Sequence, residues 1–144
     1  MSYQQYVLHC LLPIAVIFGV LTPGIVSCSK HETPQKTDEE LAADAALKSY
    51  TALYGGQTKM FLDQRIHAGS LSDEYRRQLL DCYRRHLSLV NSRHQGVSRV
   101  EVSRAEKAAD LGIMQVFLVL SFGDGTCEEV VVPMVERGGQ WMLK

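Results

Sequence analysis

Four hydrogen-bonding side chains recur on apolar helical stripes, namely Tyr50, Tyr54, Tyr83 and His86. Side chains of this kind can donate hydrogen bonds to a ligand held in an apolar pocket. A proton-transfer enzyme also needs a carboxylate base that faces the same pocket. No carboxylate is expected at an inward strand position. Glu128 and Glu129 are adjacent, so one of them faces each way, and solvation at a hairpin end explains both.

We therefore expect the tyrosines to be amphipathic core residues with their hydroxyls at the rim, and His86 to be a partly buried helix residue. The four side chains remain candidates for lining a pocket. We assign no catalytic residue and no cofactor, because no Ser/His/Asp constellation and no glycine-rich phosphate loop occurs.

The cysteines offer little further chemistry. Neither a CxxC motif nor a Cys/His spacing typical of a metal site occurs, so we predict no metal. Cys82 and Cys127 have two alternatives: they pair in an oxidising compartment, or they are separate buried thiols that behave as small apolar residues.

Basic residues gather in the second half of the chain. Two arginine pairs lie about two turns apart on nearly one face of a predicted helix, an arrangement that could attract an anion or lipid headgroups. Acidic residues on the same helix favour a solvated face instead. Nucleic-acid binding is disfavoured by the net charge of −1 and by the lack of an exposed aromatic set. The cluster consists of Arg76, Arg77, Arg84, Arg85, Arg93, His94, Arg99 and Arg104.

The first 29 residues contain no charged side chain, although the chain has 15 Lys and Arg and 16 Asp and Glu. Residues 7–26 are long enough to span a membrane, which needs about 20 apolar residues. The best secretory-signal segment is Leu11–Leu21, followed by the turn Thr22-Pro23-Gly24. An uncleaved membrane helix is the alternative to a signal peptide.

The tetrapeptide Ile25-Val26-Ser27-Cys28 resembles the lipobox of bacterial lipoproteins. The resemblance implies cleavage before Cys28 and acylation of its thiol and its new amino terminus, and two or more acyl chains anchor a protein stably. We therefore expect a signal peptide over residues 1–27, which also removes Cys10, and a lipidated tether over 28–37. The protein is then expected in the bacterial cell envelope, on the periplasmic side or at the outer-membrane surface.

Three helices are expected next. Thr37-Asp38-Glu39-Glu40 forms a capping box, and Gly55-Gly56 ends the helix that it starts. A second, short helix is predicted over residues 58–67. A long helix is predicted from about Asp73 to Ser92, because apolar residues recur at three- and four-residue steps.

The apolar period then changes to two. Val100 and Val102 alternate with polar residues, which predicts a half-buried strand. Residues 113–122 are apolar on both faces, which is typical of a central strand covered on each side. A Gly-Asp-Gly hairpin, a strand over 126–135 and a last strand over 140–143 complete a four-stranded antiparallel meander. The fold class is therefore α+β, with the N-terminal helices packed on a curved sheet in one domain over residues 38–144.

Three segments of this domain resemble a known family: Ala52-Leu53-Tyr54-Gly55-Gly56, Phe122-Gly123-Asp124-Gly125-Thr126, and Val135-Glu136-Arg137-Gly138-Gly139-Gln140-Trp141-Met142-Leu143. Together they are similar to small lipoproteins of Gram-negative bacteria with a nuclear transport factor 2-like (cystatin-like) domain. The resemblance implies a cone whose mouth can hold a small ligand. Members include isomerases, dehydratases and binding modules, and the fold alone does not choose among them.

We therefore expect a membrane-anchored lipoprotein whose domain is a binding or interaction module, monomeric or homodimeric, with an unknown protein or small-molecule partner. The alternative is a small-molecule carrier, or an isomerase or dehydratase that uses the cone. A third hypothesis is a structural protein that dimerises through its sheet face. A cone filled by Leu, Val and Phe would favour the module. A pocket that exposes His86 or a tyrosine beside a carboxylate would favour the enzyme.

Overall fold

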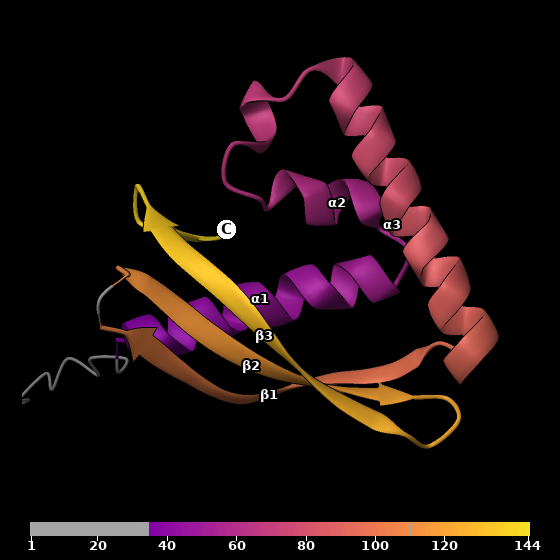
Figure 1. Cartoon of the computed structure of the whole chain (residues 1–144). Helices are drawn as coiled ribbons and strands as arrows, with labels where there is room; N and C mark the ends of the chain where they lie inside the picture. Colours follow the sequence, from indigo (N-terminus) through magenta and orange to yellow (C-terminus); the bar gives the residue numbers. More distant parts are fainter. Residues whose placement is uncertain (1–34, 110) are drawn as a thin grey trace, which may run out of the picture. The chain divides into compact units, whose positions relative to one another are not determined.

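The computed structural model describes residues 35–109 and 111–144. The predicted signal peptide and Cys28 lie outside the described residues, as does most of the predicted tether. In chain order the elements are α1 (Asp38–Tyr54), α2 (Thr58–Asp63), the 3₁₀ turn η1 (Ala68–Ser70), α3 (Asp73–His94), β1 (Val97–Ala108), β2 (Ile113–Phe122), β3 (Cys127–Arg137) and β4 (Gln140–Leu143) (Figure 1).

Helix α1 begins at the predicted capping box. The Thr37 hydroxyl accepts a hydrogen bond from the Glu40 amide at 3.3 Å, and the Glu40 carboxylate accepts one from the Thr37 amide at 2.9 Å. The helix ends at Gly55, and Gly56 follows with a φ of 81°. Ala42 and Ala46 are fully buried, because alanine lets a helix lie close to a sheet.

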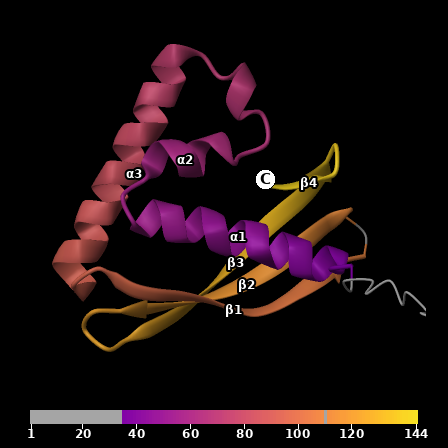
Figure 2. The ribbon, with the colours of Figure 1, turned by 180° about the vertical axis from the view of Figure 1, so that it is seen from behind.

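The four strands form one antiparallel sheet in the order β1-β2-β3-β4, as predicted. Helix α1 packs on one face of this sheet and contacts all four strands (Figure 2). The inward side chains of β2 and β3 form the core with α1 and α2. Its members include Ala42, Ala46, Leu53, Phe61, Met114, Val116, Leu118, Val132, Met134 and Leu143.

Strand β2 is central, but the prediction that both of its faces are covered is wrong. Its inward residues are buried, whereas the alternate ones, such as Phe117 and Val119, are only half-buried. In the described part of the chain the helices lie on the inner face only. On the outer face the Arg104 guanidinium lies 3.5 Å from the centre of the Phe117 ring, and this cation–π contact covers part of the apolar surface.

Helix α2 is shorter than the predicted 58–67. The chain leaves the helix after Asp63 because residues 64–66 pair with the C-terminal strand. The Ile66 amide donates to the Leu143 carbonyl at 2.7 Å, and the Leu143 amide donates to the Gln64 carbonyl at 2.9 Å. A long-range backbone pairing therefore ends a helix that local periodicity would continue.

Helix α3 extends two residues beyond its predicted end and stops at Gln95-Gly96, where both residues have positive φ. None of its 22 residues is fully buried. Half-buried Tyr83 and Leu87 pack against the core, and further contacts hold the helix toward its two ends.

The N-terminal half of α3 is held by α2 and the turn that follows it. Arg76 donates to the Ala68 carbonyl at 2.8 Å and pairs with the Asp63 carboxylate. The Tyr83 ring packs edge-on against Phe61, with 5.1 Å between the ring centres. These contacts fix where α3 starts relative to the core.

The C-terminal end of α3 is held by the β2–β3 hairpin. The Gly123 amide donates to the Gly96 carbonyl at 2.9 Å, and the Asp124 amide donates to the His94 carbonyl at 3.1 Å. The His94 ring stacks on Phe122 with 4.7 Å between ring centres. Only glycine fits at position 123, because a Cβ there would lie 2.5 Å from the Gln95 carbonyl oxygen.

We predict that Gly123→Ala lowers the free energy of unfolding by about 1–3 kcal/mol, since the added methyl group forces the hairpin and the helix end apart. The matched control is Gly69→Ala, where a Cβ would meet nothing within 4 Å. It should change stability by less than about 0.5 kcal/mol. Urea denaturation of both variants measures the difference. Equal stabilities would contradict the close approach.

Candidate functional site

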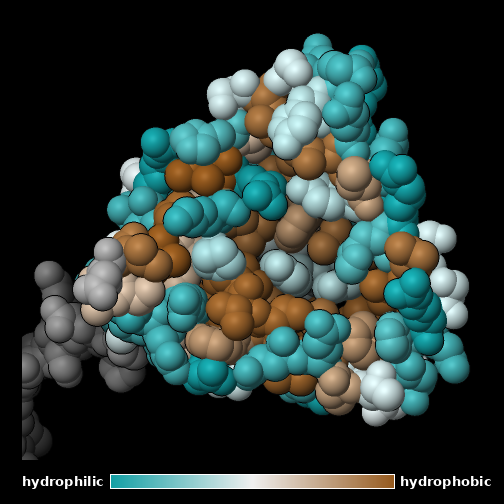
Figure 3. Space-filling model, viewed as in Figure 1, coloured by the Kyte–Doolittle hydropathy of each residue, from teal (hydrophilic) through white to brown (hydrophobic). Residues whose placement is uncertain are grey.

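A groove lies between α3 and the inner face of the sheet, with a volume of about 250 Å³. We call it the α3 groove. Its floor is apolar and comes from β2 and β3, while its rim is polar and comes mostly from α3. Figure 3 shows apolar surface in the recess between the hydrophilic long helix and the sheet. The lining residues are Tyr54, His86, Leu89, Val90, Arg93, His94, Leu120, Phe122, Glu128 and Val130.

A carboxylate does face this groove, so the prediction that no strand carboxylate lies inward is wrong. Glu128 pairs with buried Leu120 across β2 and β3, and it alternates with inward Val130 and Val132. Its neighbour Glu129 faces the other side, where it pairs with Arg104 at 3.0 Å. Glu128 has no ion-pair or hydrogen-bond partner within the described residues.

The opposite wall of the groove carries a cation. Arg93, in the last turn of α3, is exposed and has no hydrogen-bond or ion-pair partner among residues 35–109 and 111–144. Earlier on α3, Arg85 hydrogen-bonds only within its own helix. The other three arginines pair with carboxylates: Arg76 with Asp63, Arg77 with Glu74, and Arg84 with Asp81. These pairs are the solvated helix face that the sequence predicted. Arg93 therefore differs from them in leaving its guanidinium free beside an apolar floor.

Two of the four candidate side chains line this groove. The rings of Tyr54 and His86 lie 6.1 Å apart. Burial raises the pKa of Tyr54 to about 12, with smaller contributions from Tyr50 and from the negative charge of Glu128. The Tyr54 phenol is therefore protonated at neutral pH and available as a hydrogen-bond donor. His86 is exposed, not partly buried as expected.

The other two candidates, Tyr50 and Tyr83, lie outside the groove lining. Both pack edge-on against Phe61, at 5.5 and 5.1 Å between ring centres. Burial raises the pKa of Tyr50. The Tyr83 hydroxyl is buried and has no hydrogen-bond partner among the described residues, so the expectation of a hydroxyl at the rim is wrong for this residue.

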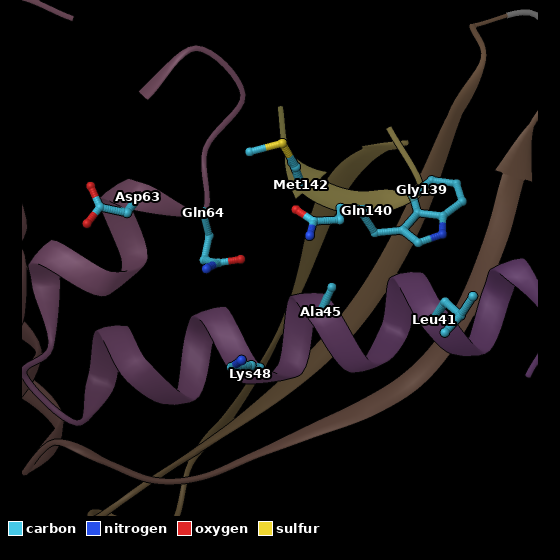
Figure 4. Close-up of a pocket in the computed structure, with 9 residues that line it drawn as sticks. Leu41, Ala45, Lys48, Asp63, Gln64, Gly139, Gln140 and Met142 are labelled. Carbon is cyan, nitrogen blue, oxygen red and sulfur yellow. The ribbon is translucent and has the colours of Figure 1, made fainter. Parts of the chain in front are cut away.

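A second hollow, of about 380 Å³, lies between α1, the end of α2 and β4 (Figure 4). Its carboxylate is already used, because Asp63 pairs with Lys59 and Arg76. Figure 4 shows the Asp63 side chain pointing away from the other lining residues. Half-buried Trp141 lines this hollow and packs against the core. The α3 groove, with two unpaired charges of opposite sign, is the better candidate for a ligand site.

Comparison with solved structures identifies the fold. The crystal structure of a candidate nuclear transport factor 2-like transpeptidase from Campylobacter jejuni matches with a TM-score of 0.56. The match covers 69% of this chain and 94% of that one at 14% identity. The domain has a nuclear transport factor 2-like fold. No protein-family model matches the sequence, and no curated protein is significantly similar to it.

The two cysteines of the nuclear transport factor 2-like domain are both free and exposed, so neither predicted alternative holds. The two cysteines do not pair because they lie on different sides of the sheet. Cys127 pairs with Ser121 on the outer face, whereas Cys82 is on α3, which borders the inner face. Neither sulfur enters the core.

Among the residues that the structure describes, no three His, Cys, Asp or Glu side chains come together to hold a metal ion. Nor does any described helix combine the length and apolar character needed to cross a bilayer.

The hairpin that closes one end of the groove is stabilised by Asp124. Its carboxylate accepts hydrogen bonds from the Thr126 hydroxyl at 2.6 Å and the Thr126 amide at 2.9 Å, and it contacts the His94 ring nitrogen at 2.9 Å. These contacts, the Thr126 hydroxyl first among them, lower the pKa of Asp124 to about 2.

We predict that Asp124→Asn destabilises the protein at neutral pH. Because the folded pKa lies below the unfolded value of 3.8, the carboxylate contributes fully above about pH 4 and loses its contribution as pH falls toward 2. The gap in urea midpoint between wild type and variant should shrink as pH falls from 4 to 2. Asp81→Asn, in an exposed helix pair, is the control and should show a smaller gap. A gap that is independent of pH would contradict this role.

Proposed function

We propose that the protein is a lipid-anchored component of the bacterial cell envelope whose nuclear transport factor 2-like domain binds a small ligand in the α3 groove. The anchor is supported by the lipobox-like Ile25-Val26-Ser27-Cys28 at the boundary between the charge-free and the charged parts of the chain. A lipid on Cys28 would hold the domain at a membrane surface through the tether over residues 28–37.

One observation carries the binding role: two side chains of opposite charge, each without a partner among the described residues, line the same groove as an apolar floor. Small-molecule sites combine apolar walls with a few polar groups that orient the ligand. The floor is supplied by Leu120, Phe122 and Val130, and the polar groups by Arg93 and Glu128. A volume of about 250 Å³ suits a metabolite smaller than typical drug-sized ligands, whose pockets are about 300–1,000 Å³.

A second candidate function, proton-transfer catalysis, is supported by the position of Glu128. An inward carboxylate now lines the same groove as a protonated phenol, that of Tyr54, and an exposed imidazole, that of His86. A carboxylate base and a phenol donor are the pair that enolising enzymes use. Such an enzyme would exchange a ligand proton for deuterium in heavy water, and Glu128→Gln would abolish the exchange.

The anchor predicts a specific labelling result. In cells supplied with a fatty-acid analogue, the full chain should be labelled and recovered with membranes. The Cys28→Ala variant should lose the label, because the acylated thiol is gone. Cys10→Ala is the matched control, since Cys10 would leave with the signal peptide. Retention of label in Cys28→Ala would contradict the anchor.

The groove predicts a face-specific effect of one large side chain. Val130 faces the groove, whereas the adjacent Val131 lies on the outer face and is 51% exposed. Val130→Trp should fill the groove and abolish the binding of small-molecule fragments. Saturation-transfer NMR on the detergent-solubilised full chain measures this binding. Val131→Trp should leave binding unchanged, and thermal melts confirm that both variants fold. Equal binding by the two variants would exclude the groove as the ligand site.

A further inference from the structure

We infer that the ligand of the α3 groove is a small zwitterion with an apolar substituent, of the chemistry of an apolar amino acid. This inference rests on the proposed function of the groove and deepens it. It assigns the ligand carboxylate to Arg93 on α3 and the ligand ammonium to Glu128 on β3.

The first support is the contrast between paired and unpaired charges on each wall. On β3, Glu129 has a partner in Arg104, whereas its neighbour Glu128 has none in the described residues. On α3, Arg84 has a partner in Asp81, whereas Arg93 has none. Of these four residues, only Glu128 and Arg93 lack a partner in the described residues, and both line the groove.

The second support is that the two charges do not neutralise each other. Arg93 and Glu128 border the same groove but form no ion pair with each other, so both charges are available to a ligand. A guanidinium holds a carboxylate through two parallel hydrogen bonds, and a carboxylate accepts strong hydrogen bonds from an ammonium group. A ligand with only one charge would leave one wall unpaired.

The third support comes from the residues beside the two charged groups. His94 is held by Asp124 and stacks on Phe122, so the last turn of α3 that carries Arg93 is fixed at the groove. On the other wall the Tyr54 phenol lies close enough to Glu128 for the carboxylate to raise its pKa. The backbone that carries Arg93 is therefore held at the groove, and the Tyr54 phenol offers a hydrogen-bond donor beside Glu128.

The apolar floor of the groove favours an apolar substituent on the ligand. Leu120 and Phe122 are buried, at 2% and 7% exposure, and Val130 is half-buried beside them. A branched apolar group of a few carbon atoms would cover this floor and remove apolar surface from water. A zwitterion with a strongly polar substituent would gain less there.

Three isosteric probes separate the two charges: L-leucine, 4-methylpentanoate without the amine, and 3-methylbutylamine without the carboxylate. Saturation-transfer titrations on the detergent-solubilised full chain measure the Kd of each. We expect L-leucine to bind about tenfold more tightly than either analogue, because each analogue loses one charged hydrogen-bonding group. Empty detergent micelles control for partitioning of the probes.

Charge-removing variants assign each end of the ligand. Arg93→Gln should weaken L-leucine about tenfold and leave 3-methylbutylamine unchanged. Glu128→Gln should weaken L-leucine by a similar factor and leave 4-methylpentanoate unchanged. The matched controls are Arg84→Gln and Glu129→Gln, which remove paired charges outside the groove and should leave all three Kd values as in the wild type.

The outcomes separate this inference from the proposed function. If either analogue binds as tightly as L-leucine, or if both variants leave its Kd unchanged, the zwitterion inference is wrong. Loss of that same binding in Val130→Trp would then still support the groove. If L-leucine does not bind at about 10 mM, a concentration that detects weak ligands, the inference is also wrong. The binding of other small-molecule fragments then tests the groove separately.

Discussion

The groove depends on how helix α3 is held at the C-terminal end. The β2–β3 hairpin donates two backbone hydrogen bonds to His94 and Gly96, and this approach is close enough to require Gly123. Arg76 and Tyr83 fix the other part of the helix against α2. No residue of α3 is fully buried, so these contacts, together with the packing of Tyr83 and Leu87 against the core, set its distance from the sheet.

A helix supported in this way leaves a space between itself and the sheet, which a fully packed helix would fill. The space is bounded by the apolar inner face of β2 and β3 and by the polar last turns of α3. A charged side chain at this space finds no partner in the adjacent core, because the core side chains there are apolar. Arg93 and Glu128 are exposed and have no hydrogen-bond or ion-pair partner among residues 35–109 and 111–144. The proposed charged ligand would complement both.

Local signals predicted most of the fold. The capping box before Leu41, the Gly55-Gly56 stop and the Gly-Asp-Gly hairpin are short-range features, and the structure contains all three. The failures came from long-range contacts. Pairing with the C-terminal strand ended α2 early. Three consecutive valines at 130–132 hide the period of β3, so only its register with β2 shows that Glu128 faces inward. Arg93 resembled other surface arginines until the structure showed which of them have partners.

Native-state amide hydrogen exchange tests most directly whether α3 and the hairpin hold the groove open together. The account predicts that the amides of Gly123 and Asp124 and those in the last turn of α3 share one opening free energy, below that of the buried strand β2. They should therefore lose protection at the same denaturant concentration. Exchange of the last turn of α3 at a different concentration from the two hairpin amides would show that the contact does not hold the helix, and would contradict the account.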